Sequence, residues 1–529
     1  MKFRNLAALS LGFVFLYNIL FFQTGMGLGT GLMFALLNIY FYLTRNKESQ
    51  NLSYAFASSI AAVIFAFLIA FRDNGVLQMI NYLLALVFSS IALFFYKYGS
   101  SFQLTLPNFL LIPLSSFFQT ILSLFSVFEG KEKTSGNGDN ASTSAIVRGS
   151  VVSLILVTIL LVLLTQGDLV FSKVVNNFLS SIWERIIVSI LVLVALITIG
   201  LTKIKQHLSV LNSEANISQG KIYELVIILG SIVTLFAIFI AVSFRYLFLP
   251  VAEENLREIG INSATYSEYV RAGFSELLIA ATIVLCVIIY VSRFTHKLQE
   301  KQKQLVQFFT TILAIENVLL LLSAAKRLFL YTEAHGLTRS REFGLAFLIW
   351  VVVILMILLA GALYKISRAS LTKLVLLTTL IVLITLSAIN LDELIAVNYP
   401  PTVNKEVDYT YLSSLSTDGY KSWIPAIVST ENLFAQLINT QELTPEDYRK
   451  FTYANEAIHT LSTNHFGYLN DRYGSSTKWQ SFNLSEYSAY QHIKDEKEVF
   501  SKLPELLLRA DMIEAKFTSE VRKNTQFDR

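Results

Sequence analysis

LTKLVLLTTLIVLITLSAI (residues 371–389) and VVSLILVTILLVLLT (residues 151–165) are long apolar stretches with almost no charge, and they decide the class of fold. A helix needs about 20 apolar residues to cross ~30 Å of hydrocarbon, and only a helix or a closed barrel pairs all its backbone groups there. At least ten such runs precede residue 390. The sequence therefore predicts an all-α, polytopic transmembrane helix bundle.

The composition agrees with this interpretation. Hydrophobic residues make up 54% of the chain and charged residues only 15%, against about 25% in soluble domains. The single cysteine, Cys286, lies inside an apolar run, which excludes an intramolecular disulfide. We expect membrane lipids to surround the bundle, and we expect no nucleic-acid partner.

Apolar runs predict about eleven spans, and their boundaries are 6–22, 29–44, 53–71, 76–95, 148–165, 186–202, 222–244, 272–291, 308–325, 344–363 and 372–390. Residues 106–128 are ambiguous, because Pro107, Pro113 and several serines suit an interfacial or re-entrant helix better than a span.

Four regions follow from these patterns. Residues 1–128 hold the N-terminal spans and the interfacial segment, and residues 129–147, rich in Gly, Ser, Asn and Lys, are expected to be a disordered cytoplasmic loop. Residues 148–391 form the core membrane bundle. Residues 392–529 carry 20 acidic and 14 basic residues, a net charge of −6, and are expected to form a mainly helical soluble domain.

Two helices of this tail can be recognised from their signals. Thr444 reads as an N-cap before Pro445 and the acidic pair Glu446 and Asp447, which opens a helix to about residue 461. Residues 503–523 carry an apolar stripe at helical spacing.

Lysine and arginine placement predicts the topology, because short cytoplasmic loops are enriched in both. Loops 45–52, 96–147, 203–221, 292–307 and 364–371 are basic and are expected inside. Loops 245–271 and 326–343 are then outside, and the tail after Asp392 is extracytoplasmic.

Ionisable residues within spans are costly unless they are paired or face water, so they are the first places to look for function. Glu316 lies near the middle of span 308–325 beside Asn317, and Glu276 lies just inside the outer end of its span. Glu316 is either a functional group of the bundle or a packing residue whose polar atoms are satisfied by neighbours.

A second group of residues gathers at the predicted outer face, against the usual charge bias. It comprises Arg245, Arg271, Lys326, Arg327, His335, Arg339 and Arg341, with Tyr246, Tyr266, Tyr269 and Tyr331 among them. These cations either pair with acidic residues of the same face, such as Glu268, Glu276 and Glu342, or form a pocket for an anionic group such as a lipid phosphate or a glycan carrier.

Other chemical signatures are weak. The six histidines have no metal-like spacing, so we expect no metal site and no cofactor. The glycine-rich stretch TGMGLGTGL (residues 24–32) joins two spans rather than a strand and a helix, which favours a turn or close helix packing over nucleotide binding.

Five stretches resemble successive signatures of a known family. They are YSEYVRAGFSELL (266–278), NVLLLLSAAKRLFLYTEAHGLTRSREFGLAFLIW (317–350), LDELIAVNY (391–399), DYTYLSSLSTDG (408–419) and KWQSFNLSEYSAY (478–490). Over residues 165–490 the chain resembles a bacterial membrane family known only as a domain of unknown function, numbers four-one-five-three and four-one-seven-three.

The resemblance implies a multi-pass protein of the bacterial inner membrane and carries no activity with it. It implies that certain residues match the family's motif positions, namely Tyr266, Glu268, Tyr269, Arg271, Gly273, Phe274, Glu276, Asn317, Arg327, Tyr331, His335, Gly336, Thr338 and Arg339.

Three functions remain open. The first is an envelope sensor or scaffold that binds an envelope protein partner or an anionic lipid or glycan headgroup at its outer face. The second is a transporter or lipid-handling protein with Glu316, Glu276 and Arg245 along a path. The third is a membrane-embedded transferase or hydrolase that uses Glu276 or His335 as acid or base, with arginines holding a phosphate.

Overall fold

The chain is almost entirely helical in the computed structural model. The structure describes residues 3–99, 102, 105–116, 119–120, 181–201, 219–248, 263–292, 298–364, 366–403, 406–441, 443–474 and 478–527. Within these ranges the only strands are β1 (Thr402–Val403) and β2 (Glu406–Val407), which pair antiparallel with Thr402 opposite Val407. The all-α prediction is confirmed.

Ten of the eleven predicted spans coincide with helices in the described ranges. They are α1 (Phe3–Leu20), α2 (Leu28–Leu43), α3 (Leu52–Leu68), α4 (Gly75–Lys97), α9 (Ser181–Leu201), α10 (Gln219–Phe248), α12 (Ser263–Ser292), α13 (Glu300–His335), α14 (Arg339–Leu363) and α15 (Arg368–Ala388). The predicted span 148–165 and the predicted loop 129–147 lie outside the described residues. The ambiguous segment begins with a short helix, α5 (Leu106–Leu110).

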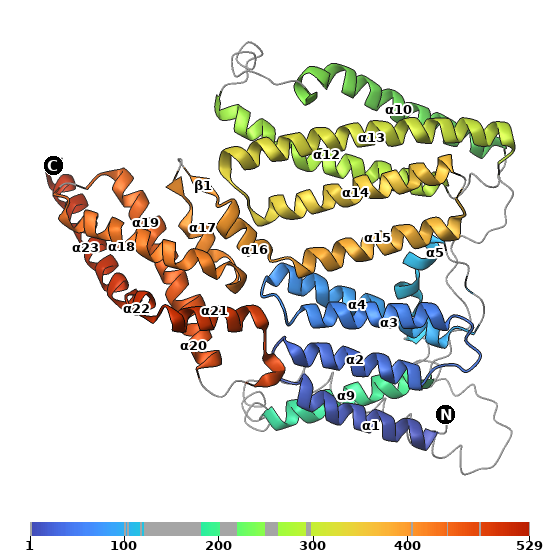
Figure 1. Ribbon diagram of the computed structural model, residues 1–529, viewed down its shortest axis with the longest axis horizontal. Coiled ribbons are helices and arrows are strands. Elements are labelled where there is room, and N and C mark those ends of the chain that lie inside the picture. Colours follow the sequence, from blue (N-terminus) through green and yellow to red (C-terminus); the bar gives the residue numbers. More distant parts are fainter. Residues whose placement is uncertain are drawn as a thin grey trace. The chain divides into compact units, whose positions relative to one another are not determined.

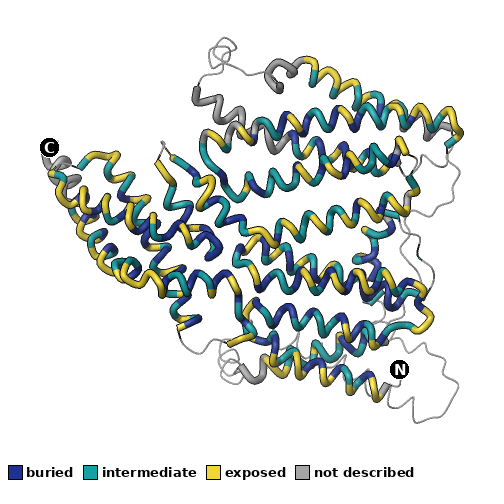
Figure 2. The backbone as a smooth tube through the Cα atoms, viewed as in Figure 1, coloured by how far each residue is buried: buried dark blue, intermediate teal, exposed yellow. Residues whose placement is uncertain are grey.

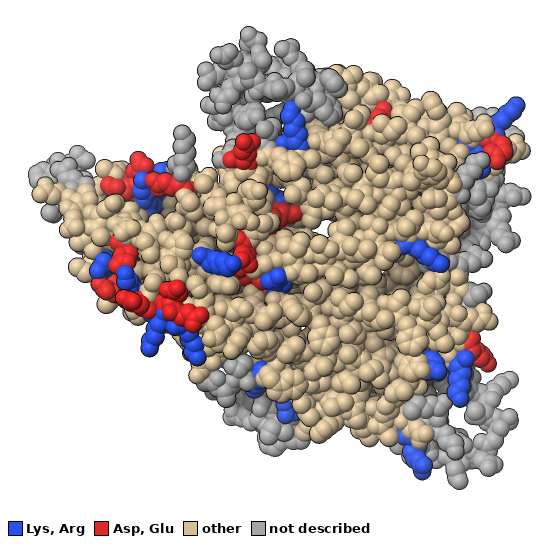
Figure 3. Space-filling view, viewed as in Figure 1, with Lys and Arg blue, Asp and Glu red and all other residues tan. Residues whose placement is uncertain are grey.

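Four of these helices are long and apolar enough to cross a membrane: Gly75–Lys97, Glu300–Lys326, Arg339–Gly361 and Ala369–Ala388. Between 11% and 39% of each apolar window is buried, and the share is lowest in α15, whose tube is mostly intermediate or exposed in Figure 2. Charged side chains are sparse over α14 and α15 and are found at helix ends and on the tail (Figure 3). Exposed apolar helices of this kind require a lipid surrounding rather than water.

Contacts within the chain divide it into two compact units. The first comprises Met1–Phe71, Val76–Leu211 and Thr477–Leu484, and the second comprises Arg72–Gly75, Asn212–Ser476 and Ser485–Arg529. The division does not follow the boundary between spans and tail, because each unit takes a short piece from the other's stretch of sequence.

In the first unit, α1 packs against α2 and α9, and α2 packs against α3. Its core is aromatic, with Tyr40, Phe94 and Phe95 fully buried. The hydroxyl of Tyr40 donates to the carbonyl of Leu196 over 2.6 Å. The ammonium of buried Lys97 donates to the carbonyls of Thr44 (2.7 Å) and Gly200 (3.0 Å), both near helix C-termini, where the helix dipole favours a cation.

A piece of the tail completes this unit. The 3₁₀ turn η5 (Trp479–Ser481) packs on α2, and the amide of Leu28 donates to the carbonyl of Phe482 over 3.2 Å. A Cβ built on Gly27 would lie 2.6 Å from the carbonyl carbon of Ser481, so only glycine permits this approach. The glycine-rich stretch therefore serves close packing, as its sequence context predicted.

In the second unit, the long helices α10, α12, α13, α14 and α15 lie alongside one another (Figure 1). Helices α10, α12 and α14 each pack against α13, and α15 packs against α14. The chain then enters the tail through one turn of helix, α16 (Leu391–Glu393), only two residues after α15 ends.

The rest of the tail is a set of short and medium helices. In chain order they are η2 (Leu394–Asn398), α17 (Tyr409–Ser414), η3 (Thr417–Ser422), α18 (Trp423–Asn439), α19 (Pro445–Thr460), η4 (Leu461–Gly467), α20 (Tyr468–Tyr473), α21 (Leu484–Asp495), α22 (Lys497–Phe500) and α23 (Leu503–Phe527). Both tail helices recognised from sequence are confirmed: Thr444 caps α19 by accepting from the amide of Asp447, and Leu506, Ala510, Ile513 and Phe517 bury the stripe of α23.

The tail of the second unit packs on the turn between α13 and α14. Leu337 is buried with Ile395 and Leu412, and its amide donates to the carbonyl of Tyr399 over 2.8 Å. Gly336 has φ +72°, and a Cβ there would overlap the carbonyl oxygen of Pro400. This turn therefore needs glycine both for its backbone conformation and for the space that the tail occupies.

Candidate functional site

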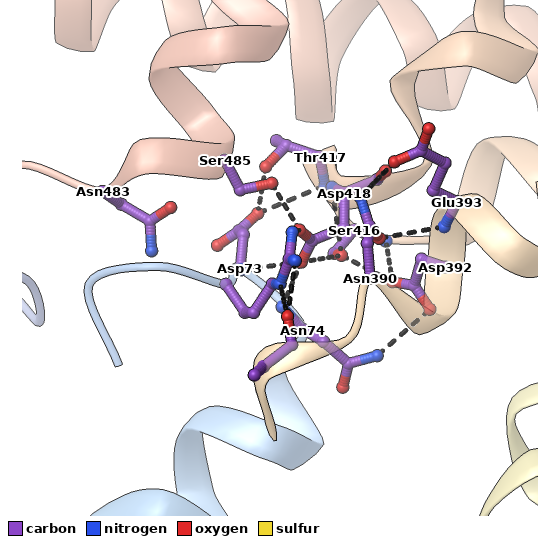
Figure 4. Close-up of polar contacts among 12 residues, drawn as sticks. Asp73, Asn74, Asn390, Asp392, Glu393, Ser416, Thr417, Asp418, Asn483 and Ser485 are labelled. Atoms are coloured by element: carbon purple, nitrogen blue, oxygen red, sulfur yellow. Dashed lines mark hydrogen bonds and ion pairs between the residues drawn. The ribbon is translucent and has the colours of Figure 1, made fainter. Parts of the chain in front are cut away.

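Buried carboxylates and their donors gather within the second unit, where its tail meets the ends of α14 and α15 and the connection Arg72–Gly75 (Figure 4). We call this group the carboxylate junction. Its members are Arg72, Asp73 and Asn74 before α4, Arg339 and Glu342 in the first turn of α14, Asn390 and Asp392 after α15, Ser416, Thr417 and Asp418 at η3, and Ser485 in α21. All of them belong to the second unit.

Asp392 is the first anchor of the junction, and its side chain is 0% exposed. Arg339 holds it with both arms of the guanidinium: Nε donates to Oδ1 over 2.7 Å and Nη2 donates to Oδ2. Asn74 Nδ2 donates to Oδ1 (3.1 Å), and the amide and hydroxyl of Ser416 donate to Oδ2 (3.2 and 2.5 Å). A buried carboxylate is stable only with such complete pairing.

Asp418 is the second anchor and is also buried. Its Oδ2 accepts from the amides of Asp73 (2.8 Å) and Asn74 (3.1 Å), which precede α4. Its Oδ1 accepts from Ser485 Oγ (2.6 Å) and from Arg72 Nη1 (3.4 Å). Arg72 also donates through Nη2 to the carbonyl of Ala388 (2.6 Å), the last residue of α15. Asp418 therefore ties the tail to the connection Arg72–Gly75 and, through Arg72, to the end of α15.

Asp73 differs from both anchors, because no guanidinium pairs with it among the described residues. Its Oδ2 accepts from the amide (3.3 Å) and hydroxyl (2.9 Å) of Thr417. Burial, followed by the nearby carboxylates of Glu486 and Asp418, raises the pKa of Asp73 to about 7, although the two hydrogen bonds from Thr417 act to lower it.

Glu342 lies one turn after Arg339 on α14, and its side chain is buried. Neither of its carboxyl oxygens has a hydrogen-bond partner. Tyr411 completes this side of the junction: its hydroxyl accepts from the amide of Arg339 (2.9 Å), and burial raises its pKa.

A further ion pair flanks the junction in the tail. Buried Glu486 accepts from the hydroxyls of Tyr468 (3.0 Å) and Tyr473 (2.8 Å), and Arg472 Nε lies 2.9 Å from its Oε2. Burial raises the pKa of Glu486, whereas the charge of Arg472 lowers it.

The anchors Asp392 and Asp418 have their oxygens occupied by donors, so the arrangement is suited to holding elements together. It has no free nucleophile or metal-binding geometry at these two positions, and no group of three His, Cys, Asp or Glu side chains elsewhere in the described ranges is placed to hold a metal ion. The side chain of Asp418 in η3 binds Arg72, Asp73 and Asn74, and Arg72 in turn binds the end of α15.

The candidate residues predicted from sequence fall in different places. Arg339 is part of the junction, but its partner is Asp392 rather than an acidic residue of its own loop. Arg341 Nη1 donates to the carbonyl of Gly336, which stabilises the turn against the tail. Lys326 and His335 lie half-buried near the end of α13.

Glu316 and Asn317 are both buried in α13. Asn317 Nδ2 donates to the carbonyl of Ala281 in α12 over 3.1 Å, while its Oδ1 and Glu316 Oε2 have no hydrogen-bond partner. At 1.5 Å per residue, Glu316 lies ~15 Å along the helix from Lys326, so the midspan pair and the helix-end residues are separate places.

The structure gives helical backbone but no side-chain description for the remaining candidates. These are Arg245 in α10, Tyr266, Glu268, Tyr269, Arg271 and Glu276 in α12, and Arg327 and Tyr331 in α13. The anionic pocket and the acid–base role of Glu276 therefore stay predictions.

Sequence reasoning missed most of the junction. Asp73 and Asn74 lie in the four-residue connection between the predicted spans 53–71 and 76–95, for which no prediction was made from the sequence. Asp392, Asp418 and Ser485, however, lie in three of the stretches that carried the family resemblance. The polar residues within those signatures were the available signal, but the sequence prediction was based on the cations.

The fold and the site define the class of protein. It is helical, has apolar helices of membrane length, and binds its tail to helix ends through buried carboxylates. The chain matches the family model described as "Domain of unknown function (DUF4153)" over residues 59–425 and belongs to that family. The match covers both anchors and Arg339, and it ends before the signature at 478–490. No curated protein and no solved structure matches the chain.

Proposed function

We propose that this protein is an envelope sensor or scaffold of the bacterial inner membrane. Its tail binds an envelope component, and the carboxylate junction passes the bound state to the ends of α14 and α15 and to the connection Arg72–Gly75. The observation that carries the proposal is that two buried aspartates, Asp392 and Asp418, hold the first turn of α14, the end of α15 and the connection Arg72–Gly75 together with the tail.

The energetics support coupling rather than simple attachment. Removing one partner of a buried ion pair costs about 3–5 kcal/mol, because the other charge remains buried and unpaired. Asp392 and Asp418 share two donor residues: Asn74 donates to Asp392 through Nδ2 and to Asp418 through its amide, and the hydroxyl of Ser416 donates to both, so a change at one anchor reaches the other through these two residues. Coupling through a fully satisfied network is stronger than its single contacts suggest.

The same geometry favours a protein partner over an anionic headgroup at Arg339. The two arms of its guanidinium are engaged by Asp392, so an anion would have to displace a buried carboxylate. The exposed apolar residues of α23 offer a surface for a protein partner, since Leu508 and Met512 are 65% and 64% exposed.

Photo-crosslinking in native membranes tests this proposal. We would place benzoylphenylalanine at Leu508 or Met512, and at Leu377 on the exposed face of α15 as a matched control. We expect a discrete protein adduct from the tail positions only. We also expect Asp392→Asn and Asp418→Asn to weaken this adduct and to fail to complement a strain that lacks the chromosomal copy, at normal protein level.

Full complementation by both variants would contradict the proposal, as would the absence of a discrete adduct from every exposed tail position. Deleting the tail is a poor test here. Residues 477–484 complete the first unit, and Asp418 binds Asp73, so truncation would damage both units regardless of function.

Transport is the second candidate, and one observation favours it. Glu316 Oε2 and Asn317 Oδ1 are buried in α13 without hydrogen-bond partners, which is costly in a span unless they serve passing ions or protons. Proteoliposomes with an internal pH dye and an imposed membrane potential provide the test. A proton flux that Glu316→Gln abolishes would support transport, whereas no flux above that of protein-free vesicles would exclude a proton path.

A further inference from the structure

The charges of the carboxylate junction and of the flanking Glu486 pair do not balance. Three carboxylates have a guanidinium partner: Asp392 pairs with Arg339, Asp418 with Arg72, and Glu486 with Arg472. Two further carboxyls, Asp73 and Glu342, have none among the described residues. If all five were ionised, this buried region would hold two uncompensated negative charges.

Of these two carboxyls, Glu342 is the more costly to ionise. Its residue is 5% exposed, neither oxygen accepts a hydrogen bond, and it lies one helical turn from Arg339, whose fork is already occupied by Asp392. An unpaired ionised carboxylate at such a place costs several kcal/mol, whereas the neutral acid costs far less.

Asp73 lies on the other side of the same network. Its single bonded oxygen accepts from Thr417, and its own amide donates to the carboxylate of Asp418. The neighbouring carboxylates of Glu486 and Asp418 disfavour ionisation of Asp73, because like charges repel one another.

We propose that the carboxylate junction is a proton-binding site, in which Glu342 holds a bound proton and Asp73 exchanges one with the surrounding water. The ligand is the proton itself, because no described group of side chains is arranged to bind a metal ion. A role of these protons in sensing rests on the proposed function, whereas proton binding by Glu342 and Asp73 does not.

The charged and titratable neighbours of both groups are few. Glu342 faces Arg339 on its own helix, Asp392 of α16 and Tyr411 of α17. Asp73 faces Asp418 of η3, Glu486 of α21 and Tyr468 of α20. Neither set contains a cation that is not already paired with another carboxylate.

Loss of the proton from Asp73 has a definite structural result. The new charge lies beside the carboxylates of Asp418 and Glu486, so the repulsion acts between the connection before α4 and the tail elements η3 and α21. Alkaline conditions therefore weaken the same contacts that join the tail to the helix ends, and acidic conditions strengthen them.

Infrared spectroscopy of the full chain in lipid nanodiscs tests the binding directly, because a protonated carboxyl has a C=O absorption that a carboxylate lacks. At pH 7 we expect such a band in the wild type and its loss in Glu342→Gln. A second band should disappear as the pH is raised through the neutral range, and it should be missing in Asp73→Asn. The exposed controls Glu498→Gln and Asp495→Asn should change neither band.

Identical spectra for the wild type and Glu342→Gln at pH 7 would overturn the proposal for that residue. Because glutamine has the shape of the neutral acid, the proposal also requires Glu342→Gln to fold and to melt at or above the wild-type temperature. A Glu342→Gln protein that is unfolded would therefore count against it. None of these readouts needs a partner, so their failure is distinct from failure of the sensor function.

Discussion

The backbone amide of Asp73 donates to Oδ2 of Asp418 over 2.8 Å, although 345 residues separate the two. The first residue belongs to the short connection before α4, and the second to a 3₁₀ turn of the tail. An amide before a helix and a buried carboxylate form a favourable pair, because the N-terminal end of a helix carries a partial positive charge. This bond makes the tail part of the packing of the bundle's second unit.

Asp418→Ala removes the acceptor for five donors, which come from Arg72, Asp73, Asn74, Ser416 and Ser485. Because Arg72 then lacks its carboxylate, we expect the free energy of unfolding to fall by about 3 kcal/mol. Thermal denaturation in detergent measures this loss. The control Asp495→Ala, at an exposed position, should melt like the wild type, and equal melting of both variants would contradict the anchoring role of Asp418.

Arg339 and Asp392 should show strong coupling in a double-mutant cycle. Arg339→Met and Asp392→Leu each leave a buried charge unpaired, whereas the double variant leaves neither, so its loss should be about 3 kcal/mol smaller than the sum of the single losses. Arg339→Lys should also lower the free energy of unfolding, because an ammonium cannot make the two-armed contact with Asp392. Additive losses in the cycle would show that the pair does not act as a unit.

Asp73 should contribute to the pH dependence of the free energy of unfolding. Its pKa is raised from 3.8 to about 7, so the folded chain keeps its proton where the unfolded chain has lost it. The contribution is therefore fully present below pH 3.8 and is lost as the pH rises through 7, with a slope of at most about 1.4 kcal/mol per pH unit. Denaturation at a series of pH values should show a shallower slope for Asp73→Asn, and an unchanged slope would be evidence against this assignment.

His465 should make the opposite contribution to the pH dependence of stability. Burial lowers its pKa below 6.5, where it stacks on Trp423 at 4.7 Å and contacts the carbonyl of Ser413 through Nε2 at 2.8 Å. The unfolded chain then binds a proton that the folded chain refuses, so stability falls as the pH drops below 6.5. In the tail, His465→Gln should remove this acid sensitivity while costing about 1 kcal/mol for lost stacking. Exposed His459→Gln is the control and should leave the acid limb unchanged.

Two glycines provide a matched test of how the tail contacts the bundle. Gly336→Ala should destabilise by about 2 kcal/mol or more, since Gly336 has φ +72° and a Cβ would overlap the carbonyl of Pro400. Gly75→Ala, where a Cβ meets nothing within 4 Å, should be neutral or slightly stabilising. Melting curves of the two variants decide the matter, and equal stability would argue that the turn does not pack against the tail.

The helices were predictable from sequence because apolar runs have one stable solution in lipid, and the runs at 29–44 and 76–95 became α2 and α4 within a few residues. Capping chemistry located the start of α19 for a similar reason, since Thr444 and Asp447 interact locally. Signals that act within a few residues can be read from the chain directly.

The junction could not be predicted in this way, because its bonds join residues hundreds of positions apart. Nothing near Arg339 indicates that Asp392 rather than Glu342 becomes its partner, and Glu342 is closer in sequence. The choice depends on the chain entering the tail within two residues of the end of α15, which places α16 beside the first turn of α14. Only the three-dimensional path of the chain contains that information.

The piece of tail that completes the first unit has a consequence for biosynthesis. Asn483 donates to the carbonyl of Ile69, and 414 residues separate them. At roughly 5–20 residues per second, the ribosome needs ~20–80 s to synthesise the missing piece after α3 has formed. During that interval the glycine-lined end of α2 lacks the tail residues that pack on it, so the packing of the first unit is completed only after residue 484 has been synthesised.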